Sequence, residues 1–191
     1  MDFLAPDFLL LIRPTNSRYY ETNNYWPATV VVFRDGVSDS QMDTVAAHEG
    51  NQFLNTLKNV DKDSSSGSSA SSSIRKKLLE LLPSEYCPRF AYVVVQKRIS
   101  TRIMVPRGPS FENPPPGTVL DHTVTRFRFK DFFLVPQAVN QGTVTPTHMV
   151  VVQENGEAFK PDDIQKLAYK LTHMYFNWPG TVRGTIITCF N

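Results

Sequence analysis

The sequence has only two cysteines, Cys87 and Cys189, among its 191 residues. Two cysteines form at most one disulfide, which excludes the small secreted scaffolds that depend on several bridges. No run of apolar residues approaches the roughly 18 that a transmembrane helix requires. The first residues, MDFLAPDFLLLIR, hold acids and a proline where a signal peptide has a basic end and an uninterrupted apolar run. We therefore expect a reduced, intracellular protein without a membrane segment.

Several motifs of common enzyme classes are also missing. The sequence has no Gly-x-Ser-x-Gly elbow, no Walker loop and no glycine-rich dinucleotide turn. Its two cysteines and four histidines are scattered without the spacing of zinc ligands. These absences argue against a hydrolase of the nucleophile-elbow type, a nucleotide hydrolase, a Rossmann dehydrogenase and a zinc site.

Core-forming residues and an uneven charge distribution are present. The hydrophobic fraction of 41% and the aromatic fraction of 12% exclude a disordered chain. Residues 1–63 carry five basic and nine acidic side chains, whereas residues 97–130 carry seven basic and two acidic side chains. A basic block beside an acidic one suits a protein that holds a polyanion and collects cations. An ordinary solvated surface is the alternative interpretation.

Strand and helix patterns alternate along the chain. Four β-branched or aromatic runs predict strands at residues 28–33, 90–96, 132–135 and 149–153, and three helical patterns cover residues 38–58, 74–82 and 162–176. Continuous apolar strands predict a sheet covered on both faces, in a mixed α/β architecture. Residues 106–117 predict a proline-rich loop that cannot join a ladder. The serine-rich residues 62–73 predict an insertion inside one domain, although they could instead separate two domains.

The segment VVVFRDGVSDSQ, residues 30–41, places Asp35 directly after a buried strand. The carboxyl ends of strands are where α/β folds keep their sites. In a metal nuclease such a carboxylate would coordinate Mg²⁺ and help to align an attacking water with a phosphate. The alternative is that Asp35 only completes the turn that Gly36 allows.

Five sequence blocks follow one another along the chain: VVVFRDGVSDSQM, AYVVVQKRISTR, FENPPPGTVLDHTVT, DFFLVPQAVNQGTVTPTHMVVV and IQKLAYKLTHMYFNWPGTVR. Together they resemble the C-terminal part of the PIWI domain of Argonaute proteins, in its Piwi branch. The resemblance covers residues 17–183, whereas residues 1–16 match poorly and residues 184–191 diverge. It implies the distal half of an RNase-H-like fold, with a mixed sheet flanked by helices.

The resemblance also implies a site of four metal-binding residues in the active members, which are Mg²⁺-dependent endoribonucleases. Only Asp35 matches one of the four. Residues 1–16 do not supply the expected glutamate, and His148 matches a separate internal histidine of the family rather than the metal ligand. Holding two divalent ions requires several carboxylates. We therefore expect a truncated Piwi whose cleavage activity is lost in this chain alone.

Expected contacts with the guide RNA are better preserved. The resemblance assigns them to two strand ends, a loop and a helix end: Gln96, Lys97, Arg98, Arg102, Gln137, Gln141, Thr143 and Tyr175. The expected partners are a Piwi-interacting guide RNA and its target RNA, with Tudor-type or other silencing proteins binding through the missing N-terminal part. The expected location is the cytoplasm, including perinuclear granules, with the nucleus as a second location. The alternatives are a catalytically dead RNA-binding or protein-interaction module and a non-functional truncated gene product.

Overall fold

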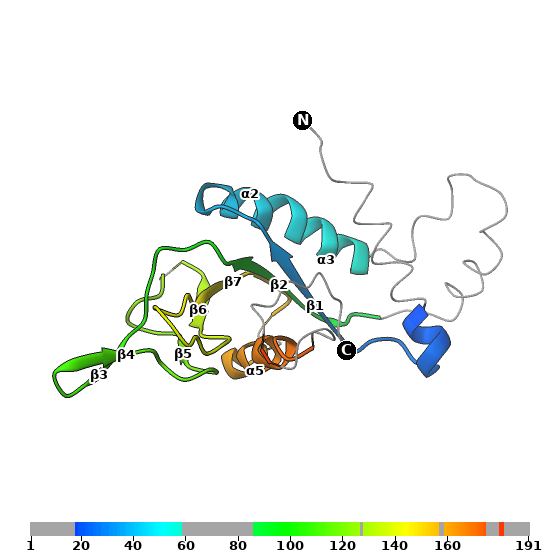
Figure 1. Cartoon of the computed structure of the whole chain (residues 1–191). Helices are drawn as coiled ribbons and strands as arrows, with labels where there is room; N and C mark the ends of the chain where they lie inside the picture. The colour runs from blue at the N-terminus through cyan, green and yellow to red at the C-terminus, as the bar shows by residue number, and fades with distance from the viewer. Residues whose placement is uncertain (1–17, 59–85, 127, 157–158, 175–179, 182–191) are drawn as a thin grey trace.

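A five-stranded mixed sheet organises the computed structural model, which describes residues 18–58, 86–126, 128–156, 159–174 and 180–181 (Figure 1). The strand order is β1-β2-β7-β6-β5. The strands are β1 (Thr29–Asp35), β2 (Arg89–Gln96), β5 (Val119–Leu120), β6 (Lys130–Leu134) and β7 (Thr147–Glu154). All four strands predicted from apolar runs are confirmed, each within two residues of the predicted ends.

Strand β2 lies inside the sheet and connects its two halves. It pairs in parallel with β1 and antiparallel with β7, and a register shift interrupts the second ladder between Tyr92 and Val93. Six consecutive residues of β2, from Phe90 to Val95, are buried. A strand buried on both faces has no need of polar alternation, which explains the continuous apolar run in the sequence.

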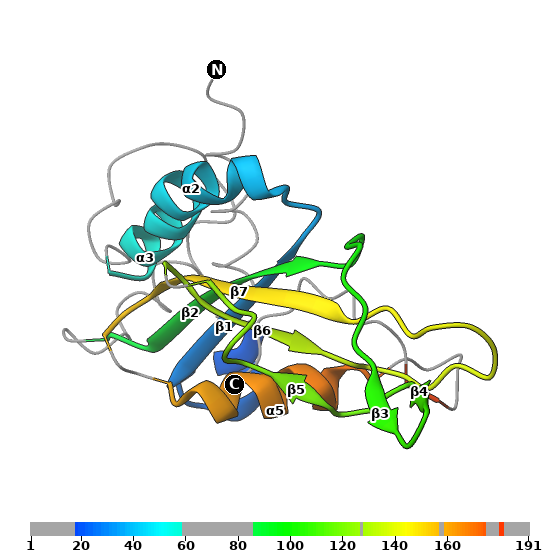
Figure 2. The same cartoon turned by 90° about the vertical axis from the view of Figure 1, so that its left-hand side faces the viewer.

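Helices cover both faces of the sheet, as the sequence predicts (Figures 1 and 2). One face carries four consecutive helical segments: η1 (Asp39–Gln41), α2 (Met42–Val45), the π-helical η2 (Ala46–Gly50) and α3 (Asn51–Lys58). Their apolar side chains pack on Val30, Phe90 and Val94. The opposite face carries α5 (Pro161–Leu171), which packs on Val31, Val93 and Phe132.

A buried acid fixes the first helical layer to the sheet. Glu49 accepts a hydrogen bond of 2.5 Å from the Tyr92 hydroxyl and one of 3.3 Å from Arg34 Nε. Burial, followed by the hydrogen bond to Glu49, raises the pKa of Tyr92 far above its usual range. Tyr92 therefore stays protonated and keeps donating to Glu49 at every physiological pH.

The α5 helix is shorter than predicted. The pattern predicts a helix over residues 162–176, but α5 ends at Leu171. The backbone N–H groups of Thr172, His173 and Met174 each bond three residues back, and the Thr172 hydroxyl donates to the Tyr169 carbonyl. These bonds close the helix end with a tighter turn. Pro161 is the first helical residue, where its missing N–H costs nothing.

The chain also forms a hairpin that the sequence analysis excluded. Strands β3 (Val105–Arg107) and β4 (Ser110–Glu112) pair antiparallel, with Pro106 opposite Phe111. The prediction that residues 106–117 could not join a ladder is therefore wrong at this end. A two-stranded ribbon consists of edge strands only, and an edge strand tolerates a proline whose missing N–H faces outward.

The strand directions bring several connections to one end of the sheet, which we call the loop edge. It comprises the carboxyl ends of β1, β2 and β6, the start of β7, and the connections at residues 97–104 and 135–146. The hairpin projects at the same end (Figure 2). The predicted insertion at 62–73 and the predicted helix at 74–82 lie outside the described residues. No helix in the described part is long and apolar enough to cross a membrane.

Gly50 is a close contact between the helical layer and β7. A Cβ atom at this position would lie 2.9 Å from Gln153 Cβ, which is bonded to the backbone and has little freedom to move. We expect Gly50→Ala to lower the free energy of unfolding by about 1–2 kcal/mol, because overpacking exceeds the gain in helix propensity. Urea denaturation measures the change. The control, Thr44→Ala, lies on the exposed side of the same helical layer and should cost nothing; stabilisation by Gly50→Ala would contradict this packing.

Candidate nucleic-acid interface

Asp35, the candidate metal ligand, is the last residue of β1 and precedes Gly36. Gly36 has a φ of +82°, a left-handed conformation that turns the chain toward η1. The Asp35 carboxylate lies 2.9 Å from Lys97 Nζ, and a third of its side chain is exposed. Lys97 follows β2 directly, so parallel pairing of β1 and β2 brings these two residues together. The predicted metal ligand and a predicted phosphate contact thus neutralise each other.

The donors around Asp35 do not fit a magnesium site by themselves. Across residues 18–58 and 86–174, wherever the structure describes them, no three His, Cys, Asp or Glu side chains gather in a group that could hold a metal ion. Mg²⁺ requires near-octahedral oxygen ligation. One carboxylate that is already paired with an ammonium group supplies too little of it.

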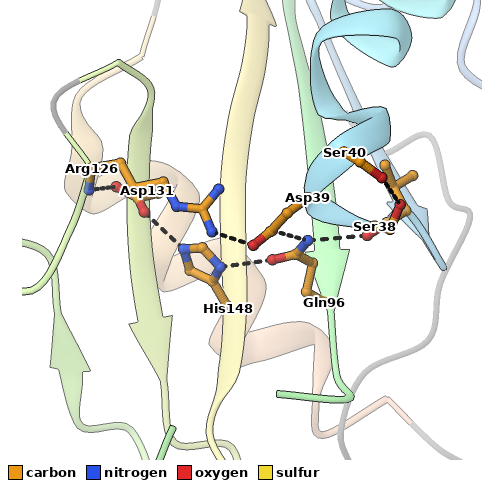
Figure 3. A network of polar contacts seen from close by, with 8 residues as sticks. Ser38, Asp39, Ser40, Gln96, Arg126, Asp131 and His148 are labelled. Carbon is orange, nitrogen blue, oxygen red and sulfur yellow. Dashed lines mark hydrogen bonds and ion pairs between the residues drawn. The ribbon is translucent and has the colours of Figure 1, made fainter. Parts of the chain in front are cut away.

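Gln96, at the end of β2, belongs to a polar network (Figure 3). Its Nε2 donates to the Val37 carbonyl at 3.1 Å and to Asp39 Oδ1 at 2.9 Å. Its Oε1 lies 2.8 Å from His148 Nδ1. The amide therefore connects the turn after β1 with β7, and its polar atoms already have partners within the protein.

His148 continues the network into the sheet. It is only 3% exposed, its ring stacks on Phe133, and its Nε2 lies 2.7 Å from Asp131 Oδ2. Asp131, also buried, accepts the backbone N–H of Arg126 at its other oxygen. The orientation of the Gln96 amide follows from its partners, because the opposite orientation would place its oxygen against two acceptors, the Val37 carbonyl and Asp39 Oδ1. Both ring nitrogens of His148 thus face oxygen atoms, one from Gln96 and one from Asp131.

Acidic side chains after β1 neutralise much of the basic block at residues 97–130. Arg126 pairs with Asp39 at 2.7 Å, and Arg128 pairs with Asp43 at 2.9 Å. The hydrogen bond from Gln96, followed by that from Arg126, holds the pKa of Asp39 below its usual range. These arginines support the contact between the helical layer and the β5–β6 side of the sheet.

Two of the predicted phosphate contacts lack such partners. Arg98 and Arg102 are exposed on the connection after β2. The Arg102 guanidinium donates to the backbone carbonyls of Ile99 and Thr101, which leave its positive charge in place. Within the described residues, neither arginine forms an ion pair with a carboxylate. This connection is where the loop edge keeps uncompensated positive charge.

The β6–β7 connection carries the remaining described candidates. Gln141 and Thr143 are exposed, and Gln137 is half-buried. Asn113 holds this connection in place: its Nδ2 donates to the Gly142 carbonyl at 2.8 Å, and its Oδ1 accepts the Val144 N–H at 3.0 Å. Because Asn113 directly follows β4, the same side chain also fixes the base of the hairpin.

The structure therefore gathers every described site candidate at the loop edge. Asp35, Gln96 and Lys97 lie at the strand ends themselves, and the others lie on its two connections. Tyr175 lies outside the described residues. The sequence analysis missed the positions that hold the edge together: Asp39, Asn113, Arg126 and Asp131. A signal existed for Asp131, because a charged residue inside an apolar strand needs a buried partner.

Comparisons with known proteins agree on one family. A family model described as "Piwi domain" matches residues 7–185. Piwi-like protein 1 of Gallus gallus is 43% identical over 165 residues, and Piwi-like protein Ago3 of Bombyx mori is 41% identical over 167. These alignments cover 86% and 87% of this chain but only 16% of each relative.

Two solved structures extend the comparison to three dimensions. Drosophila Piwi aligns with a TM-score of 0.71 and 30% identity, over 94% of this chain and 22% of its own. Kluyveromyces polysporus Argonaute, solved with a guide RNA, aligns with a TM-score of 0.72 and 21% identity, over 94% of this chain and 21% of its own. At that identity the second match supports the fold alone.

The buried pair of His148 and Asp131 should dominate the stability of the loop edge. Asp131→Ala leaves the His148 ring and the Arg126 N–H without their acceptor, which should lower the free energy of unfolding by about 3 kcal/mol. Asp121→Ala is the matched control, because Asp121 also pairs with a histidine, His122, but in solvent. We expect at most about 1 kcal/mol there. If urea denaturation shows that the two variants lose equal free energy of unfolding, the importance of the buried network is contradicted.

Proposed function

Because the chain belongs to the Piwi domain family and has the RNase-H-like fold of Argonaute proteins, we propose that it acts in small-RNA-guided silencing. In this proposal it is the part of a Piwi protein that holds the guide RNA and its target. The similarity to Piwi-like proteins favours a Piwi-interacting RNA as the guide and transposon transcripts as targets. The chain spans about 16% of the curated relatives' length.

One observation carries the proposal: the uncompensated charge of Arg98 and Arg102 lies at the same edge as the exposed polar groups of Gln141 and Thr143. Guanidinium and amide groups at strand ends suit phosphate oxygens, which are the same in every nucleotide. Such contacts give affinity without sequence preference. Base sequence would then be read by pairing between guide and target, as in other guided systems.

We further propose that this chain holds RNA without cutting it. The Asp35 carboxylate faces an ammonium group, and the described residues bring no group of three His, Cys, Asp or Glu side chains together around it. Two divalent ions need several carboxylates to offset their mutual repulsion. Magnesium-dependent cleavage therefore requires ligands from outside the described residues.

RNA binding should depend steeply on salt, and mainly through the two uncompensated arginines. Each phosphate contact with a single strand contributes about 0.7 to the log–log slope of affinity against salt. The double variant Arg98→Ala/Arg102→Ala should lower that slope by about 1.4, which fluorescence anisotropy with a labelled oligouridine measures. The matched control is Arg128→Ala/Lys130→Ala, because both of these cations already pair with carboxylates, Asp43 and Glu154. Equal slopes for the two double variants would remove Arg98 and Arg102 from the interface.

Cleavage should require more than this chain. Incubated with a guide RNA, a complementary target and Mg²⁺, the chain should leave the target intact, as gel electrophoresis would show. In a protein extended to full family length, Asp35→Ala should abolish cleavage and leave guide binding nearly unchanged. Asp43→Ala, which removes a carboxylate paired with Arg128, is the control and should retain cleavage. Metal-dependent cutting by the chain alone, at a fixed guide position, would show that the ligand assignment is wrong.

A further inference from the structure

The β3–β4 hairpin exposes more apolar surface than a free ribbon requires. Phe111 is 68% exposed, and Met104 and Val105 are 40% and 43% exposed. The ribbon projects beyond the sheet at the loop edge (Figures 1 and 2). Exposed apolar side chains that gather on one projecting element mark an interaction surface more often than a solvent-facing loop.

The pairing of the hairpin sorts these side chains onto two faces. Pro106 lies opposite Phe111, so their rings share one face of the ribbon. On the other face Arg107 pairs with Glu112 at 2.8 Å, which holds the two strands in register. Val105, opposite Glu112, lies on this second face, so the apolar face of the ribbon consists of Pro106 and Phe111.

The connection that precedes the hairpin carries positive charge. The connection from β2 to β3 carries Arg98 and Arg102, both exposed, within thirteen residues of Phe111 along the chain. An apolar aromatic ring that follows guanidinium groups closely along the chain, where no described carboxylate pairs with them, is the combination by which proteins hold single-stranded nucleic acid: the cations contact phosphates, and bases stack on the ring. A purely apolar protein partner would gain nothing from these arginines.

The position of the hairpin is fixed relative to the proposed phosphate contacts. Asn113 follows β4 directly and bonds both Gly142 and Val144 of the β6–β7 connection. The Pro114 that follows is buried. The hairpin that carries Phe111 and the connection that carries Gln141 and Thr143 are therefore fixed to each other rather than being two independent loops.

We propose that the β3–β4 hairpin is a base-stacking platform for single-stranded RNA, with Phe111 as the stacking ring. This inference rests on the proposed function, since it needs RNA at the loop edge. Stacking on Phe111 is indifferent to base identity, because every base has a flat π-face. The platform therefore adds affinity for an unpaired strand without interfering with recognition by base pairing.

Two RNA probes separate stacking from charge: an oligouridine, and an abasic ribose-phosphate oligomer of the same length. Phe111→Ala should weaken oligouridine binding by the full chain at least about fivefold, because stacking on one aromatic side chain contributes on that scale. The salt slope should stay unchanged. The abasic oligomer should bind the variant and the original chain equally, because it has no base to stack.

Two further variants complete the test. Phe111→Tyr keeps the ring and should keep the affinity for oligouridine. Tyr25→Ala removes an aromatic side chain that is 59% exposed but lies before β1, away from the loop edge, and should change nothing. If the Phe111→Ala variant binds oligouridine as tightly as the original chain does, or if it loses affinity for both oligomers equally, the stacking platform is refuted while the RNA-binding proposal stands. If the original chain binds neither oligomer, the proposed function itself fails.

Discussion

The buried contact between His148 and Asp131 is the interaction on which the loop edge depends. It joins β7 to β6, and the Gln96 amide extends it to β2 and to the turn after β1. These strands come from distant parts of the chain, so one satisfied polar network sets their ends at a common level. Every connection that carries a candidate RNA contact starts from a strand held in this way. A network with one partner missing would leave polar groups buried and unpaired.

A second constraint is the distribution of charge between the acidic and basic halves. Asp35, Asp39 and Asp43 recur at every fourth residue and pair with Lys97, Arg126 and Arg128. Most of the basic block therefore stabilises the fold rather than offering charge to a ligand. Arg107 and Lys130 pair with Glu112 and Glu154, so Arg98 and Arg102 remain, on the connection that leads from β2 to the hairpin. Within the basic block, the positive charge that no described carboxylate pairs with thus lies at one edge of the sheet.

Local pattern predicted the elements of the fold but not the contacts between distant ones. Short β-branched runs such as residues 90–96 are typical of buried strands, and Asp35 follows such a strand, so its place at a sheet edge was predictable. The pairing of Asp131 with His148 depends on the register between two strands, which neither strand encodes alone. Pro106 suggested a loop because its effect depends on whether the strand is an edge. The early end of α5 depends on the hydroxyl of Thr172, which helical periodicity does not reveal.

The central claim is that RNA binds at the loop edge, and an NMR titration of the isotopically labelled chain with oligouridine tests it most directly. Backbone amide signals of residues 97–112 and 137–143 should shift together and saturate together. Signals of residues 18–28, at the opposite end of β1, should stay in place. Shifts confined to that opposite end, or spread evenly over the sheet, would contradict the account.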